Sequence, residues 1–409
     1  MRIIVLVLLI TSMTHSTTAQ TIDKKLHKKA VELAHKIIIT DGHVDLPYRL
    51  RVQNFRLERE YLGIPIKTDK GDFDYVRAKE GGLDAPFMSI YIPSKYQQER
   101  EGGAKELADT LIDMIDGIIE AHPDHFAHGY SPDEVEANFK NGVMSLPLGM
   151  ENGAPLYTLE DVKYFHDRGI RYVTLTHGKN NLICDSSYDE ERKWNGLSPY
   201  GREVIAEMNR IGIMVDISHV SDETFYQVIE ITIAPIIASH SSCRKFTPGF
   251  ERNMDDDMIK KLGENGGVIQ INFGSSFLDA EFGKRRDELR DQLNTILDEK
   301  GLSKDDEDAK EVIEQFKEDN PILFADVETV ADHIDHVVSL AGIDHVGIGS
   351  DFDGVGDSLP TGLKDVSQYP NLIAVLLARG YSEDDIAKIG WGNVARVWRS
   401  VERVAAASH

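Results

Sequence analysis

The sequence predicts an α/β protein of the (β/α)8, TIM-like barrel class, and three observations support this prediction. Apolar runs of strand length alternate with helical segments along most of the 409 residues. Roughly eight such runs occur, as a barrel of this class requires. Histidines and carboxylates follow several of the runs, at the positions where a parallel barrel opens its mouth.

The predicted strands are short and mostly apolar. They cover residues 37–40, 85–92, 142–149, 171–175, 213–217, 234–238, 267–272 and 345–349. Between them, residues 159–168 and 199–210 carry the apolar faces of helices, and Ser221 is a suitable N-cap for a helix over 223–231.

Two segments depart from this alternation. Residues 278–320 are long, highly charged and helix-prone, which predicts a helical insertion before the last strand. A lid and the subunit contact of a homodimer both stay open for it, and a solvated helical hairpin is favoured. The tail, residues 382–404, predicts an amphipathic helix with a turn at 390–393. We expect its apolar stripe to pack on the outside of the barrel, through Val394, Val397, Trp398 and Val401.

The N-terminus has the pattern of a signal peptide. Arg2 precedes an apolar run over residues 3–10, which is too short to span a bilayer, and Thr17-Thr18-Ala19 supplies small residues for cleavage. We expect a signal peptide over 1–19, a single mature domain over 20–409 and a periplasmic or extracellular location. An uncleaved anchor is the alternative. The rest of the chain has no long apolar segment, so we expect no transmembrane span in the mature protein.

The composition bears on which partners the protein can bind and on how many disulfide bridges it can form. The formal net charge of -24 repels phosphate backbones, so nucleic acid is not an expected partner. Two cysteines exclude a disulfide scaffold. One bridge between Cys184 and Cys243, or two plain buried thiols, stays open.

Seven polar side chains near the ends of predicted strands indicate a metal site. A strand followed by Ser-His occurs twice, and His43-x-Asp45 places an imidazole and a carboxylate on one side of a strand. A glutamate could bridge two ions, which would activate a shared water. A hydrogen-bonded strand end is the alternative for any one of these residues, but it would have to hold for all seven at once. They are His43, Asp45, Glu151, His177, His219, His240 and Asp351.

These residues belong to longer motifs that resemble the membrane (renal) dipeptidase family of zinc dipeptidases. The resemblance spans about residues 37–398, nearly the whole mature chain. It rests on DGHVDLPY at 41–48, GIRYVTLTH at 169–177, Asn180, Asp185-Ser186, GLSPYG at 196–201, VDISHVS at 215–221, SHS at 239–241, Arg252-Asn253 and GSDFDG at 349–354.

The resemblance implies a barrel of the metal-dependent hydrolase type that holds two Zn²⁺ and cleaves dipeptides. His43 and Asp45 would bind one ion, His219 and His240 would bind the other, and Glu151 would bridge them.

The resemblance also implies roles for three further residues. His177 would steady the oxyanion, and Asp351 would orient the attacking water and carry its proton to the leaving amine. Both would contact the substrate. Arg252 would pair with the terminal carboxylate of the dipeptide.

Three positions differ from the usual pattern of the family. Val44 stands where asparagine is common, Asn152 where glycine usually follows the bridging glutamate, and Phe277 where a tyrosine can help to hold the carboxylate. Two other functions stay open. One is a related metal-dependent amidohydrolase that acts on lactams, cyclic amides or N-acyl amino acids, for which Arg252 would be dispensable. The other is a non-catalytic binding protein with the same fold.

Overall fold

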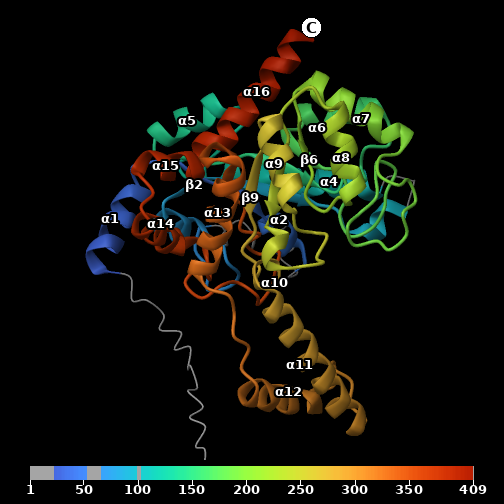
Figure 1. Cartoon of the computed structure of the whole chain (residues 1–409), viewed down its shortest axis with the longest axis vertical. Helices are drawn as coiled ribbons and strands as arrows, with labels where there is room; N and C mark the ends of the chain where they lie inside the picture. The colour runs from blue at the N-terminus through green and yellow to red at the C-terminus, as the bar shows by residue number, and fades with distance from the viewer. Residues whose placement is uncertain (1–22, 53–65, 99–102, 409) are drawn as a thin grey trace, which may run out of the picture.

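In the computed structural model, which describes residues 23–52, 66–98 and 103–408, eight parallel strands form the central sheet (Figure 1). The predicted signal peptide lies outside these residues. The strands follow one another around the barrel in chain order, so the predicted (β/α)8 class is confirmed. They are β1 Ile39–Val44, β2 Leu83–Tyr91, β5 Leu148–Glu151, β6 Ile170–Thr174, β7 Met214–Asp216, β8 Ile237–Ser241, β9 Val268–Ile271 and β10 Val346–Ile348.

The barrel closes where the chain leaves β10 and meets the end of β1. Val44 forms a parallel bridge with Phe352. The amide of Asp45 donates to the carbonyl of Phe352 at 2.9 Å, and the amide of Asp351 donates to the carbonyl of His43 at 3.1 Å. Closure therefore brings together two motifs that lie some three hundred positions apart in the sequence.

Three predicted strands differ from the observed ones in ways that bear on the site. β1 extends to Val44 and β8 to Ser241, so His43 and His240 lie within their strands and not after them. The single strand predicted over 142–149 is two strands, because Pro147 interrupts it. The first, β4 (Met144–Leu146), pairs with β3 (Phe126–His128) in a separate sheet of two strands, and only the second, β5, enters the barrel.

Helices cover the outside of the barrel, and several begin at a side-chain cap. Ser221 accepts a hydrogen bond from the amide of Thr224, as predicted, and Ser198 caps the helix that begins at Pro199. The helices are α1 Lys24–Ala34, α2 Leu46–Val52, α3 Tyr75–Gly81, α4 Gly103–Ala121, α5 Pro132–Lys140, α6 Leu159–Asp167, α7 Pro199–Ile211, α8 Asp222–Ile231, α9 Asp256–Asn265, α10 Ser275–Leu278, α11 Ala280–Glu299, α12 Glu307–Asp319, α13 Val327–Ala341, α14 Tyr369–Ala378, α15 Glu383–Ala387 and α16 Asn393–Ala407.

The C-terminal helix seals one end of the barrel, which corrects the expectation that it packs on the outside. Its stripe is buried, and Trp398 contacts Phe87 of β2 at 5.4 Å between ring centroids. The same apolar cluster contains Met214, Ile237 and Val268, each the first residue of its strand or close to it. The helix therefore covers the amino-terminal end of the barrel. The turn expected at 390–393 is instead a π-helical segment, Lys388–Gly392, that leads into α16.

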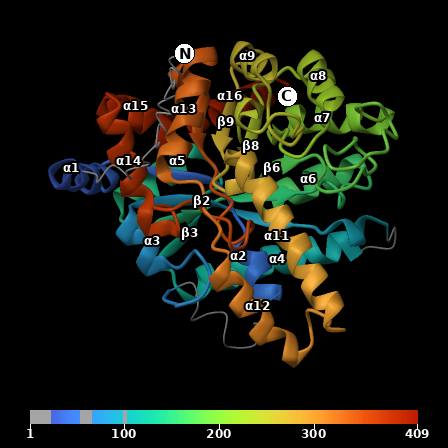
Figure 2. The same cartoon turned by 60° about the horizontal axis from the view of Figure 1, so that its bottom comes forward.

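The segment that the sequence marks as an insertion contains α11 and α12, which extend away from the barrel (Figures 1 and 2). The two helices contact each other, and Leu289 and Leu297 of α11 and Ala309 of α12 are buried. The N-terminal end of α11 lies beside the mouth of the barrel, where Ala280 and Gly283 line a cavity. The pair of helices α11 and α12 is therefore attached at the mouth of the barrel, while the end of the pair farthest from the barrel is surrounded by solvent.

The two cysteines, Cys184 and Cys243, are free and buried. Burial raises the pKa of the Cys184 thiol well above its usual range. The structure thus agrees with plain buried thiols and not with a bridge. Among the described residues, no helix has the length and apolar character that crossing a membrane requires.

Candidate metal centre and active site

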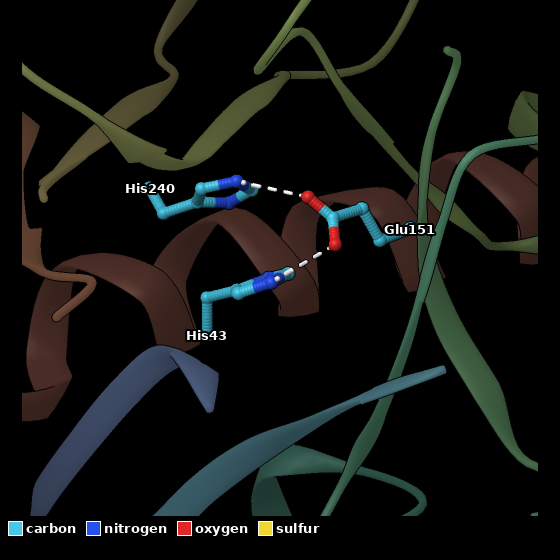
Figure 3. A group of neighbouring side chains, drawn as sticks. All are labelled: His43, Glu151 and His240. Carbon is cyan, nitrogen blue, oxygen red and sulfur yellow. Dashed lines mark ion pairs between the residues drawn. The ribbon is translucent and has the colours of Figure 1, made fainter. Parts of the chain in front are cut away.

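Four imidazoles and a buried glutamate converge at the carboxyl ends of the strands. Figure 3 shows His43 and His240 stacked, with each ring directed at a different oxygen of Glu151. Their ring centroids lie 3.8 Å apart. Nε2 of His43 is 3.4 Å from Oε2 of Glu151, and Nε2 of His240 is 3.2 Å from Oε1. Glu151, the last residue of β5, thus lies between ligand-type groups that come from β1 and β8.

The ligand-type groups fall on two sides of Glu151. On the Oε2 side, Nε2 of His43 is also 3.5 Å from Oδ2 of Asp45. On the Oε1 side, Nε2 of His219 is 3.0 Å from Glu151 and 2.9 Å from Nε2 of His240. This is the arrangement that two cations sharing one bridging carboxylate would need.

Buried atoms without partners test whether a metal fits these residues. Among the described residues, Nε2 of His43 and Oδ1 of Asp45 are buried and have no hydrogen-bond partner. Buried polar atoms are normally satisfied, so atoms left without partners at such a site are consistent with an ion as the missing partner. Imidazole nitrogen and carboxylate oxygen are also the ligands that zinc accepts. The residues therefore fit divalent cations.

Electrostatics at the site point the same way. Burial alone would raise the pKa of Glu151, but the neighbouring imidazoles, beginning with His43 and His177, hold it well below its usual range. Burial, with a contribution from the charge of Arg252, lowers the pKa of His219 and His240 well below the usual range. An ionised Glu151 beside the neutral imidazoles of His219 and His240 is the protonation state that binds metal on that side of the carboxylate.

His43 shows the negative potential of the site. Burial would lower the pKa of this imidazole, but Tyr172, Glu151 and Asp45 raise it well above its usual range. Glu151 and Asp45, which lie beside Nε2, therefore favour a positive charge at that position, carried either by a proton or by a metal ion.

His177 and Asp351 lie at the edge of the cluster and line the cavity above it. Nε2 of His177 is 3.8 Å from Oε1 of Glu151, and its Nδ1 is 3.4 Å from the hydroxyl of Tyr91. Asp351 forms a ligand-type group with His43 and Asp45. Burial raises the pKa of Asp351 well above its usual range, and the charges of Asp45 and Glu151 add to this effect. The cavity has a volume of about 800 Å³.

Arg252 is close to the cluster but does not line this cavity. Its guanidinium donates to Oγ of Ser241 at 2.6 Å and to the carbonyl of His240 at 2.7 Å. The ring of Phe277, which does line the cavity, lies 5.3 Å from the guanidinium carbon. Nε of Arg252 is buried without a hydrogen-bond partner among the described residues. The predicted carboxylate-binding residue thus lies behind an aromatic ring.

Backbone strain is concentrated at the site. His219, Asp351 and Asn152 adopt left-handed φ values of 69°, 64° and 80°. Residues other than glycine adopt such values rarely. Backbone conformations that cost free energy in this way cluster at functional sites. Asn152 tolerates this conformation where the family usually has glycine, and its amide donates to the carbonyl of Ile92 at 2.9 Å. A Cβ at Gly354 would come within 2.2 Å of carboxylate oxygens of Asp45 and Asp351, so only glycine fits there.

Four residues that support the cluster from behind through hydrogen bonds were not predicted as site residues. Asn272 donates to Oδ2 of Asp351 at 2.8 Å, and the hydroxyl of Tyr172 lies 2.9 Å from Nδ1 of His43. Oγ of Ser239 lies 2.8 Å from Nδ1 of His240 and donates to Asp216 at 2.6 Å. Each lies on or just after a predicted strand, so a search for polar residues inside apolar strands would have found them.

An eight-stranded parallel barrel that gathers histidines and carboxylates at its carboxyl end has the architecture of a metal-dependent hydrolase. The family model described as membrane dipeptidase, peptidase family M19, matches residues 27–409. The chain belongs to this family, as its sequence motifs predict.

Individual relatives agree with this assignment. Dipeptidase tcpJ of Claviceps purpurea is 34% identical over 392 residues, which cover 94% of this chain and 82% of that protein. Dipeptidase 3 of Mus musculus is 32% identical over 387 residues, covering 93% of this chain and 68% of the mouse protein.

Solved structures give the same result. The probable dipeptidase PvdM from Pseudomonas aeruginosa has a TM-score of 0.77 and 26% identity, over 94% of this chain and 100% of that one. A metallo peptidase from Rhodobacter sphaeroides, liganded with a phosphinate mimic of the dipeptide L-Ala-D-Ala, has a TM-score of 0.72 and 25% identity, over 89% and 99%. The chain is a metallo-dipeptidase.

Proposed function

We propose that this enzyme is an exported binuclear zinc dipeptidase that hydrolyses the peptide bond of dipeptides. The observation that carries the metal centre is the convergence of three imidazoles, those of His43, His219 and His240, on the two oxygens of Glu151. One ion would be held by His43 and Asp45, the other by His219 and His240. When bound, two divalent cations lower the pKa of a water and polarise the scissile carbonyl.

His177 is placed to stabilise the oxyanion that forms from the carbonyl oxygen. Its ring lines the cavity, and its Nδ1 lies within reach of the Tyr91 hydroxyl. When Tyr91 donates to Nδ1, the proton of the imidazole is on Nε2, beside Glu151 and the cavity. A fixed donor aimed at the developing negative charge stabilises the transition state more than the substrate.

Asp351 is placed to move the proton. Asn272 donates to Oδ2 of this carboxylate at 2.8 Å, and Oδ1 accepts no hydrogen bond from the residues that the structure describes. Asp351 also lines the cavity beside the metal-type cluster. In the proposed reaction, Oδ1 accepts the proton of the attacking water and delivers it to the leaving nitrogen, which departs as a neutral amine.

A dipeptide fits the site because the proposed clamp and the cluster are close together. Arg252 hydrogen-bonds the carbonyl of His240, a proposed ligand, so a carboxylate bound to the guanidinium lies near the reacting centre. The Rhodobacter sphaeroides relative binds a mimic of L-Ala-D-Ala, which is a substrate of this size. Arg252 would therefore select peptides in which the residue that follows the scissile bond carries the terminal carboxylate.

Metal content tests the proposed centre directly. We expect about two zinc ions per chain in protein purified without chelator, because two groups of nitrogen and oxygen ligands flank Glu151. Elemental analysis gives the number. Removal of both ions should abolish dipeptide hydrolysis, and zinc should restore it. Full activity in metal-free protein would rule out the mechanism.

Export is proposed from the basic, apolar and small residues that follow one another over positions 2–19. We expect N-terminal sequencing of the exported enzyme to begin near Gln20. An active form that retains Met1 and stays embedded in a membrane would contradict this proposal. Because the test concerns only the leader, its failure would leave the catalytic proposal intact.

A further inference from the structure

We infer that Tyr172 and the Asp216–Ser239 pair are positioning residues, which set the tautomers of His43 and His240 so that the Nε2 lone pair of each ring faces the metal centre. This inference rests on the proposed metal centre and adds the residues that prepare its ligands. Zinc binds the nitrogen that has no proton, and the hydrogen bond at the other ring nitrogen decides which one that is.

The tautomer of His43 follows from counting protons at Tyr172. The phenol has one hydrogen, which it donates to the carbonyl of Gly42 at 2.9 Å. The same oxygen lies 2.9 Å from Nδ1 of His43. Because the hydroxyl proton is already used, Nδ1 must be the donor in the second bond. In the neutral ring, Nε2 then has a free lone pair, directed at Glu151 and Asp45.

Packing holds the Tyr172 hydroxyl in this position. Tyr172 is fully buried inside the barrel, and its ring lies against Phe87 with a centroid distance of 5.3 Å. A Cβ placed on Gly149 would come within 1.9 Å of the ring. Glycine at that position is therefore required for the ring to reach His43, and the ring has little room for another orientation.

The tautomer of His240 follows from the same argument with a different acceptor. Oγ of Ser239 donates to Oδ2 of Asp216 at 2.6 Å. The carboxylate of Asp216 also accepts from the hydroxyl of Thr174 and from the amides of Ser218 and Ser239. With its proton used, the Ser239 hydroxyl must accept from Nδ1 of His240 at 2.8 Å. Nε2 of His240 is again left free.

The two supporting groups, Tyr172 alone and Asp216 with Ser239, act on different sides of Glu151. Tyr172 supports the ring beside Asp45, and Asp216 with Ser239 supports the ring beside His219. His219 itself has no such support, since its Nδ1 is buried without a hydrogen-bond partner in the described part of the chain. Loss of either supporting group should therefore weaken the binding of one ion more than the binding of the other. A general loss of packing would lower stability without this selectivity.

The test is a zinc titration of the full-length enzyme against a chromophoric chelator, without substrate. Tyr172→Phe removes the hydroxyl and keeps the ring, and we expect one of the two zinc dissociation constants to rise about 10- to 100-fold. Ser239→Ala should raise the other constant by a similar factor, and the double variant should raise both. Tyr200→Phe is the control, because the hydroxyl of Tyr200 donates to the carbonyl of Leu156 and contacts no ligand.

The outcomes separate this inference from the proposed function. Wild-type zinc constants in both Tyr172→Phe and Ser239→Ala would overturn the inference while leaving the metal centre intact. A wild-type enzyme that binds fewer than two zinc ions would instead refute the proposed centre. Thermal unfolding of each variant identifies any that fails to fold. The two supporting groups contact different histidines. Wild-type zinc binding in one single variant therefore contradicts the inference for the histidine that this variant's group contacts.

Discussion

Asp351→Asn is expected to lower kcat for dipeptides by about 10²- to 10⁴-fold, the range for loss of a general acid–base group. The amide oxygen of the new side chain can still accept from Asn272, as Oδ2 of Asp351 does at 2.8 Å. Its amide nitrogen then faces the cavity, and it cannot accept the proton of the attacking water. KM and zinc content should change little, because shape and ligands are kept.

Asp287→Asn is the matched control for this variant. Asp287 lies on α11 and also lines the cavity, so the substitution removes one negative charge from the lining of the same cavity without changing a residue of the cluster. We expect its kcat to stay near the wild-type value. If Asp351→Asn loses activity only in proportion to lost zinc, Asp351 acts as a ligand, and the proton must travel by another group.

Most of the barrel could be predicted from local patterns, because each strand is a short apolar run with its own turn signals. The failures have physical causes. Residues 142–149 look like one strand, but Pro147 divides them between two sheets. The apolar stripe around Trp398 indicates a buried face, but hydrophobicity does not say against which surface it packs. That choice depends on where the barrel end lies.

The candidate ligands were predictable because they stand at strand ends in short motifs. Their supports were not. Tyr172 is 129 positions from His43, and Asn272 is 79 positions from Asp351. Such pairs meet only through the register and closure of the barrel, since β1 and β6 are not adjacent strands, and hydrophobic patterns do not specify that geometry to the atom. The position of Phe277 in front of Arg252 is of the same kind.

Arg252→Ala is expected to raise KM for dipeptides on the order of a hundredfold, with a smaller change in kcat. The guanidinium is buried and has an unpartnered Nε, so a bound carboxylate would form a desolvated ion pair. Truncating one member of such a pair costs roughly 2–5 kcal/mol. Dipeptide amides lack the charge, so the variant should affect them much less. The measurement is steady-state kinetics on matched dipeptides and amides.

Two controls separate carboxylate binding from support of the metal site. Arg252 donates to the carbonyl of His240, so zinc content must be measured in the same preparations. Phe277→Ala removes the ring that contacts the guanidinium and lines the cavity. If Arg252 binds the carboxylate, the Phe277→Ala variant should still prefer dipeptides to their amides. Arg252→Ala should lose this preference. Equal losses of dipeptide and amide hydrolysis in Arg252→Ala would show that Arg252 does not bind the carboxylate. An amidohydrolase with lactam or N-acyl amino acid substrates would then fit the site better.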